Sequence, residues 1–244
     1  MSTRLWHETV PGDPLREMAL SHALLQRVAA GELPPILRVA VPGPTLALSR
    51  LDARADGFGP AVAASRRHGF VPVVRLGGGH AAAYGPGSLL VEWFTPQAAA
   101  LTGNAERYAT FGAALVGALH ELGVDAVERE LPGEYCAGAH SVALGDRVKI
   151  AGVSQRVVQG AALVTAMVLL RDDPPIGPVL RDVYAALAID WRPETAGAIA
   201  DLQEPPAVAT LTAELARRFG VDAPWTPDAA TARLADALVD QHRP

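Results

Sequence analysis

The chain changes character near residue 172, and this change constrains its fold more than any other feature of the sequence. Before residue 172, short apolar runs typical of strands alternate with patterns at helical spacing. We therefore expect an α+β fold, with a mixed β-sheet and flanking helices over residues 1–172 and a helical C-terminal extension over residues 173–244 packed on it. The extension is expected to contain helices only, over residues 178–188, 206–219 and 227–240.

The boundaries of several elements are well marked. Asp13 can cap the free N–H groups of a helix that begins at Pro14, and Gly31 ends that helix. A second long helical pattern covers residues 105–122, and a short one covers residues 61–67. The strand patterns are residues 36–40, 45–49, 70–75, 88–94, 125–128, 141–144, 148–151 and 161–170, and Gly145-Asp146 predicts a hairpin.

Charge and composition exclude several classes of protein. With 21 Lys and Arg against 26 Asp and Glu, the net charge is −5, and a nucleic-acid binder would instead show a basic stripe. The longest apolar run, residues 161–170, is about half the length that crosses a bilayer, so we expect no membrane segment. A single cysteine, Cys136, excludes an internal disulfide framework. We therefore expect a cytoplasmic protein.

The strand pattern at 70–75 runs into three consecutive glycines, Gly77, Gly78 and Gly79, and His80 is followed by three alanines. A backbone with so little side-chain bulk can lie against a narrow ligand and present its N–H groups to it. The spacing of these glycines differs from that of nucleotide-binding loops. The alternative is a glycine-rich turn inside a tightly packed sheet.

Cys136 and Lys149 are the only cysteine and the only lysine of the chain. Cys136 lies between glycines in a polar loop that we expect to be exposed, and a nearby cation would lower the pKa of its thiol. Lys149 stands between Val148 and Ile150 on a predicted strand, so its side chain points away from theirs and could face a cleft. The alternatives are a small buried hydrophobic residue for Cys136 and a solvated surface residue for Lys149.

These segments, in this order, resemble those of the lipoate–protein ligase and octanoyltransferase family, which is related to the biotin–protein ligases. Arg75-Leu-Gly-Gly-Gly is similar to the family's acyl-binding loop, and Lys149-Ile-Ala-Gly-Val-Ser-Gln-Arg is similar to its lysine segment. Leu37-Arg38 and the segment from Pro44 to Arg50 are similar to its early strand pair. The resemblance covers roughly residues 13–172 and leaves out the C-terminal helices.

The resemblance implies the fold of the biotin/lipoate ligase catalytic domain and a substrate that is an octanoyl or lipoyl chain. Lys149 would hold the acyl carbonyl. The acyl-binding residues would be Arg75, Gly77, Gly78, Gly79, His80, Gly152 and Ser154. The partners would be an acyl donor carrier and a lipoyl-carrier domain, such as the glycine cleavage H protein or a 2-oxoacid dehydrogenase subunit, whose lysine accepts the acyl group.

Two departures from the family pattern bear on the choice between its two chemistries. The ATP-dependent ligases have an Asn-Asp pair before the lysine segment, where this chain has His140-Ser141. Tyr135-Cys136-Ala137-Gly138 is similar to the Tyr-Cys-Pro-Gly of octanoyl amidotransferases, with Ala137 in place of proline. The resemblance is therefore closest to the cysteine-dependent transferases.

We accordingly expect double displacement, with Cys136 as the nucleophile and Lys149 stabilising the oxyanion. No metal or other cofactor would be required, and Lys149→Ala would leave the fold intact. His80 and His140 are candidate general bases. An ATP-dependent lipoate–protein ligase, which would need ATP and Mg²⁺, and a binder of acyl groups or carrier domains without turnover remain the alternatives.

Overall fold

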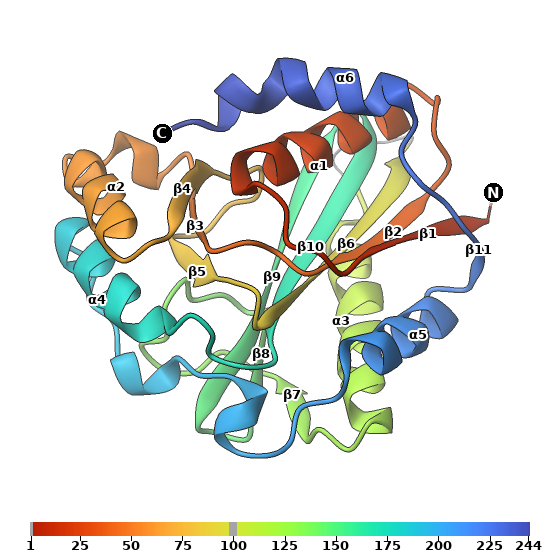
Figure 1. Cartoon of the computed structure of the whole chain (residues 1–244). Helices are drawn as coiled ribbons and strands as arrows, with labels where there is room; N and C mark the ends of the chain where they lie inside the picture. The colour runs from red at the N-terminus through yellow and green to blue at the C-terminus, as the bar shows by residue number, and fades with distance from the viewer. Residues whose placement is uncertain (1, 98–101) are drawn as a thin grey trace.

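The computed structural model describes residues 2–97 and 102–244, and it contains two sheets. The large sheet has the strand order β11-β1-β2-β6-β10-β9-β8-β7, and the small sheet has the order β4-β3-β5 (Figure 1). Strand β1 pairs in parallel with β2 and β11, β3 pairs in parallel with β4, and the other pairs are antiparallel. The strands are β1 (Thr3–Glu8), β2 (Ile36–Ala40), β3 (Thr45–Leu48), β4 (Val71–Val74), β5 (Ala82–Tyr84), β6 (Ser88–Gln97), β7 (Ala126–Glu128), β8 (Ser141–Leu144), β9 (Val148–Val158), β10 (Gly160–Leu169) and β11 (Val221–Pro224).

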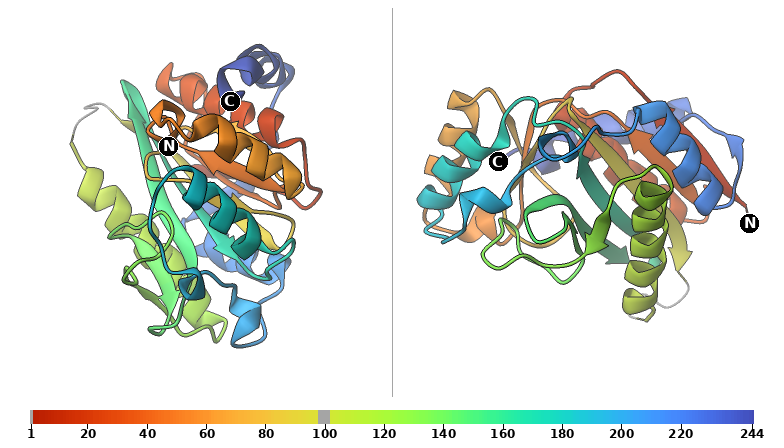
Figure 2. Two further views of the ribbon diagram at one scale, coloured as in Figure 1. Left: turned by 90° about the vertical axis from the view of Figure 1, so that its left-hand side faces the viewer. Right: turned by 90° about the horizontal axis from the view of Figure 1, so that it is seen from below.

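Six α-helices cover the two sheets, and among the described residues three short 3-10 helices lie in connections and a fourth follows α6. In Figures 1 and 2, α1 and α6 lie over one face of the large sheet, α3 and α5 lie over the other, and α2 and α4 pack beside the small sheet. The α-helices are α1 (Pro14–Ala29), α2 (Phe58–Arg67), α3 (Asn104–Glu121), α4 (Ile176–Ala186), α5 (Val208–Arg218) and α6 (Ala229–Leu238). The 3-10 helices are η1 (Asp52–Arg54), η2 (Pro193–Thr195), η3 (Ile199–Asp201) and η4 (Val239–His242).

The hydrophobic core follows these layers. Phe111 and Leu115 of α3 and Leu211 of α5 pack on one face of the large sheet. Leu24 of α1 and Leu238 of α6 belong to the cluster on the opposite face. A third cluster joins the small sheet to α2 and α4, and it places the small sheet across from the large one.

The expected α+β class with a mixed sheet is confirmed, and so are most of the expected elements. Helix α1 begins at Pro14 with the Asp13 carboxylate accepting from the Arg16 N–H group at 2.9 Å, as the capping residues predict. Strand β9 extends well past residue 151, to Val158. The sequence did not predict β1 or β5, which are short strands near the edges of the two sheets.

The part of the chain after residue 172 does not consist of helices only, so this prediction is wrong. Val221–Pro224 forms β11, which pairs in parallel with β1 and completes the edge of the large sheet. Helix α6 packs along α1 on the same side of the molecule (Figure 1). This part therefore contributes a strand to the main sheet as well as helices around it. The division at residue 172 stays a prediction.

Candidate active site

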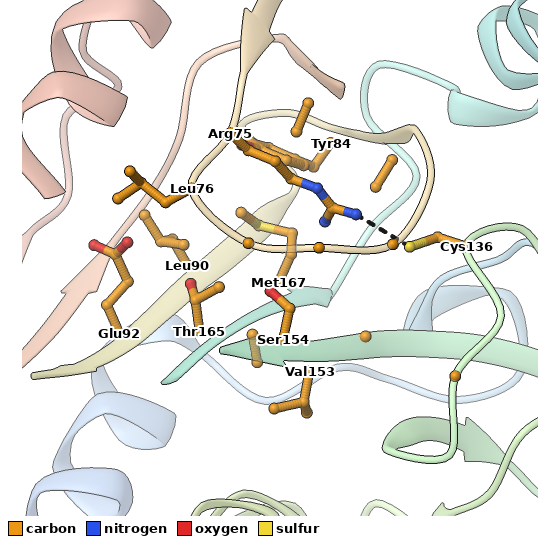
Figure 3. A pocket seen from close by; sticks show the side chains of 18 of the residues that line it. Arg75, Leu76, Tyr84, Leu90, Glu92, Cys136, Val153, Ser154, Thr165 and Met167 are labelled. Atoms are coloured by element: carbon orange, nitrogen blue, oxygen red, sulfur yellow. Dashed lines mark hydrogen bonds between the residues drawn. The ribbon is translucent and has the colours of Figure 1, made fainter. Parts of the chain in front are cut away.

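A cavity of about 360 Å³ lies between the two sheets. Its floor is made by β6, β9 and β10 of the large sheet, and its walls by α1, the small sheet, the glycine loop and the loop before β8 (Figure 3). Of the predicted site residues, eight line it: Arg75, Gly77, Gly78, Gly79, Cys136, Lys149, Gly152 and Ser154. His80 is not among the lining residues. One cavity thus brings together segments that lie far apart in the sequence.

The backbone of Cys136 has a φ angle of 44°, in the left-handed region that residues other than glycine rarely adopt. Tyr184 links the main chain of Cys136 to that of Ala81 through two hydrogen bonds. The N–H group of Cys136 donates to the Tyr184 hydroxyl at 2.6 Å, and that hydroxyl donates to the carbonyl of Ala81 at 2.9 Å. Burial raises the pKa of Tyr184 far above its ordinary value, so the hydroxyl keeps its proton and can make both bonds. Helix α4, through Tyr184, therefore positions the cysteine.

Arg75 holds the sulfur directly. Its Nη2 atom lies 3.2 Å from Cys136 Sγ and donates to the carbonyl of His80 at 2.7 Å (Figure 3). Burial acts to raise the pKa of the Cys136 thiol, but the charges of Arg75 and Lys149 outweigh it, and the net effect is a pKa below the ordinary value. This environment favours the thiolate, which is the nucleophilic form of cysteine.

Lys149 lies under the loop that contains Cys136, with 1% of its surface exposed. Its Nζ atom lies 2.8 Å from Glu134 Oε1, 3.0 Å from the carbonyl of Tyr135 and 2.9 Å from the carbonyl of Cys136. Glu134 also accepts from the N–H group of Leu131 at 3.0 Å and from the Ser141 hydroxyl. The lysine is therefore buried, ion-paired and bonded to the main chain of the cysteine itself.

The loop around Cys136 is less exposed than the sequence led us to expect. Glu134 and Tyr135 have only 4% and 3% of their surfaces exposed, and Cys136 is partly buried. The prediction of an open polar loop is therefore wrong for these residues. They are buried because Glu134 faces Lys149 and Tyr135 packs in the cluster that joins the small sheet to α4.

Glycine is required at two positions of the loop that faces the cavity. A Cβ atom on Gly79 would lie 2.7 Å from Cys136 Sγ and 2.9 Å from Arg75 Nη2, and the φ angle there is 88°. A Cβ atom on Gly77 would lie 2.5 Å from Ser154 Oγ on β9. The missing side chains let the loop approach both the thiol and the floor of the cavity.

The two candidate histidines are both paired with carboxylates. His80 Nδ1 lies 2.9 Å from the buried carboxylate of Asp52, and His140 Nδ1 lies 2.7 Å from Glu128 Oε1. His140 also stacks on Tyr108 at the cavity wall, with ring centroids 3.9 Å apart. Neither ring is bonded to Cys136 Sγ; the hydrogen bond to the sulfur comes from Arg75. Within residues 2–97 and 102–244, no group of three or more His, Cys, Asp or Glu side chains is arranged to hold a metal ion.

Sequence reasoning missed two residues that build this site. Glu134 pairs with Lys149, and Tyr184 fixes the main chain of Cys136. An acidic side chain two positions before the only cysteine, in a loop bounded by glycines, was an available signal for Glu134. Tyr184 gave no signal, because only the packing of α4 against the small sheet brings it near the loop.

Comparison with known proteins shows the family to which the chain belongs. The model of the lipoyl protein ligase A/B catalytic domain family matches residues 13–225. Two curated relatives are named octanoyl-[GcvH]:protein N-octanoyltransferase. That of Geobacillus kaustophilus is 28% identical over 152 residues, which are 62% of this chain and 53% of the relative. That of Kyrpidia tusciae is 34% identical over 165 residues, which are 66% of this chain and 54% of the relative. The chain thus spans about half the length of the curated relatives it matches.

Solved structures show the same fold. A lipoate-protein ligase A bound with ATP has a TM-score of 0.78 at 22% identity, covering 99% of this chain and 95% of that one. A bipartite lipoate protein ligase from Thermoplasma acidophilum has a TM-score of 0.72 at 20% identity, covering 99% and 93%. The family match continues well past residue 172, so the expectation that the similarity stops there is wrong. The cavity between two sheets, the glycine loop and the buried lysine are therefore features of a chain that belongs to the lipoyl protein ligase A/B catalytic domain family.

Proposed function

We propose that the chain is an acyltransferase that moves an octanoyl or lipoyl group onto a lysine of a lipoyl-carrier domain through a thioester on Cys136. The observation that supports this most directly is the position of the sulfur. Cys136 Sγ lies beside the Arg75 guanidinium in the wall of the cavity between the sheets, and the Lys149 ammonium binds the main-chain carbonyl of the same cysteine. The names of the curated relatives support octanoyl transfer and a carrier of the GcvH type.

The chemistry has two displacement steps. The Cys136 thiolate attacks the acyl carbonyl of the donor; the carbon–sulfur bond forms, the bond from the acyl carbon to the carrier nitrogen breaks, and the released amine takes up one proton. The ε-amine of the acceptor lysine then attacks the thioester. That step restores the thiolate, releases one proton and leaves the acyl group in an amide on the acceptor. Neither step needs a nucleotide.

Arg75 and Lys149 have different parts in this proposal. Arg75 holds the sulfur and favours its ionised form. Lys149 adds to this effect by its charge, and its hydrogen bond to the Cys136 carbonyl keeps the residue in place. Lys149 would stabilise the oxyanion when the acyl oxygen replaces one of the two loop carbonyls that its ammonium now contacts.

The proposal is tested by incubating the purified chain with octanoyl-GcvH and measuring intact masses, with and without ATP and Mg²⁺. We expect an octanoyl adduct on the wild-type chain without ATP, none on Cys136→Ala, and transfer from the wild-type adduct to a lipoyl-domain acceptor. An adduct that persists in Cys136→Ala contradicts the assigned nucleophile. Product that forms only with ATP supports the lipoate–protein ligase. Binding of the carrier without any product supports a binder without turnover.

A further inference from the structure

The peptide group between Val74 and Arg75 lies where the small sheet leads into the glycine loop. Among the described strands, β4 pairs with β3 alone, so its other side is a free edge. The N–H group of Arg75 donates to the carbonyl of Leu48 on β3 at 2.8 Å. The C=O and N–H groups of a trans peptide point in opposite directions, so the carbonyl of Val74 faces the free edge of β4. It can be bound only from outside the sheet.

The C-terminal part of the chain supplies the donor for this carbonyl. His242 Nδ1 lies 2.7 Å from the carbonyl oxygen of Val74, which is 168 residues earlier in the chain. His242 has 3% of its surface exposed and belongs to η4, which packs beside α1 and β4 (Figure 1). The peptide group is therefore held at both ends, by β3 at its N–H group and by His242 at its carbonyl.

The hydrogen-bond network around His242 assigns the proton to Nδ1. The carbonyl of Val74 can only accept, so Nδ1 is the donor and Nε2 of the neutral ring is an acceptor. His22 Nδ1 lies 3.1 Å from that Nε2 atom, and Nε2 of Gln26 lies 3.1 Å from His22 Nε2. Burial lowers the pKa of both rings, that of His22 to about 4, so both are neutral at pH 7. A chain of donors thus runs from Gln26 through both imidazoles to the peptide group.

The guanidinium of Arg75 depends on the direction in which the main chain leaves β4. Its Nη2 atom lies 3.2 Å from Cys136 Sγ and 2.7 Å from the carbonyl of His80. Both side-chain hydrogen bonds of Arg75 in the described part of the chain come from this atom, and its Nε atom is buried without a partner there. A side chain bound through one terminal atom follows its main chain. A shift of the peptide group before Arg75 would therefore move the guanidinium relative to the sulfur.

We propose that His242 is a positioning residue, which holds the peptide group before Arg75 and thereby keeps the guanidinium against Cys136 Sγ. Its part in catalysis rests on the proposed function, because Arg75 matters to the reaction only if Cys136 is the nucleophile. Attraction between two charges falls in inverse proportion to their distance, so a displacement of about 1 Å weakens the pair of guanidinium and thiolate by about a quarter. Loss of the donor on His242 should therefore reduce the fraction of thiolate.

Two variants at position 242 separate the donor from the ring. His242→Phe keeps an aromatic ring beside His22, where the centroids are 5.2 Å apart, and removes both nitrogen atoms. His242→Asn loses the ring and keeps an amide N–H donor close to the position of Nδ1. The readout is the rate of alkylation of Cys136 by iodoacetamide as a function of pH, and circular dichroism checks the fold of each full-length variant.

We expect the alkylation midpoint of His242→Phe to lie at a higher pH than that of the wild type. Below the midpoint the rate follows the fraction of thiolate, so there the variant should react about threefold to tenfold more slowly. His242→Asn should keep the wild-type midpoint. In the Arg75→Met background, His242→Phe should cause no further shift, because the cation that it positions is already absent.

His120→Phe is the matched control, because His120 Nε2 also binds a main-chain carbonyl, that of Ala126 at 2.6 Å, and His120 does not line the cavity. It should keep the wild-type midpoint. An unchanged midpoint in folded His242→Phe overturns the inference, and so does a raised midpoint in His242→Asn, an equal shift in His120→Phe, or a further shift in the double variant. If His242→Phe does not fold, His242→Asn decides alone.

Alkylation needs no acyl donor, so these measurements are independent of the proposed function. The expected shifts, together with no octanoyl adduct on the wild-type chain, would contradict the proposed function alone.

Discussion

A buried cation lies beside each end of the cavity, Lys149 at the reactive end with Cys136 and Arg38 behind Glu17 and Glu92 at the distal end, and the carboxylates around the two cations differ in number. At the reactive end, Lys149 faces one carboxylate, Glu134, and two main-chain carbonyls. At the distal end, Arg38 is fully buried and faces three carboxylates, those of Glu8, Glu17 and Glu92. The reactive end therefore keeps its positive charge close to the thiol, because Arg75 adds a second cation there. The distal end has three carboxylates around a single guanidinium.

The buried ion pair of Arg38 stabilises the fold, whereas that of Lys149 also positions Cys136. Breaking such a pair by removing one partner is strongly destabilising, because the other charge stays buried. At the distal end the loss of stability affects only the free energy of unfolding. At the reactive end the same ion pair also fixes the loop that contains Cys136, because Lys149 binds the main-chain carbonyls of Tyr135 and Cys136. Four single variants and one double variant test this comparison.

Lys149→Met should have the largest effect. Because it removes a cation beside the reacting carbonyl, we expect the rate of thioester formation to fall about 100-fold to 1,000-fold. It also leaves Glu134 buried without its partner, so the free energy of unfolding in urea should fall by about 3 kcal/mol. The expectation that substitution of Lys149 leaves the fold intact therefore needs revision.

The double variant Lys149→Met/Glu134→Gln separates these two effects. We expect it to recover much of the lost stability, because no unpaired charge remains buried, while the rate stays low. A double variant that is as active as the wild type would contradict the role assigned to the ammonium.

Arg38→Met should come next and should act on stability. It leaves the buried carboxylate of Glu92 without its cation, and we expect the free energy of unfolding to fall by about 3–5 kcal/mol. Urea unfolding followed by tryptophan fluorescence measures this change. Thioester formation at low temperature should persist, since Arg38 does not contact the reactive end; loss of the adduct in a folded variant would contradict the comparison.

Arg75→Met should shift the titration of the thiol. Arg75 and Lys149 together hold the pKa of Cys136 below its ordinary value, so removing one of these charges must raise that pKa. The rate of alkylation by iodoacetamide, measured against pH, should then reach its midpoint at a higher pH than in the wild type. His80→Gln serves as the control, because its ring bonds to Asp52 and not to the sulfur. An unchanged midpoint in Arg75→Met would exclude Arg75 as the cation that favours the thiolate.

Glu17→Gln should have the smallest effect. The Glu17 side chain is one of three carboxylates on a single guanidinium and remains 20% exposed. Loss of its charge weakens one ion pair and relieves repulsion from the other two carboxylates, so stability should change by less than about 1 kcal/mol. A loss comparable to that in Arg38→Met, measured in the same urea experiment, would show that Glu17 is the main partner of Arg38.

The sequence predicted what depends on local pattern and failed where distant segments meet. Helix α1 followed from Asp13 and Pro14, and β10 followed from its apolar run. Strand β11 was missed because it is four residues long and exists through its pairing with β1, at the other end of the chain.

The candidate site shows the same division. The sequence singled out Arg75, Cys136 and Lys149, and the structure brings them together. It could not show that Lys149 is ion-paired with Glu134, because the reversal of the chain between β8 and β9 sets that contact. The register that aligns Glu92 with Thr165 could not be predicted from the sequence either, since it depends on how β6 and β10 pair.

The ammonium of Lys149 has three hydrogen atoms, and the structure supplies three acceptors for them. A fourth oxygen can be bound only by displacing one of the three. If the displaced acceptor is the carbonyl of Cys136, binding of the acyl donor breaks one of the hydrogen bonds that hold the Cys136 backbone in its left-handed conformation. Under the proposed function, the ammonium would then bind the acyl oxygen in the same step that frees the main chain of the nucleophile, and without an acyl donor this main chain would stay fixed.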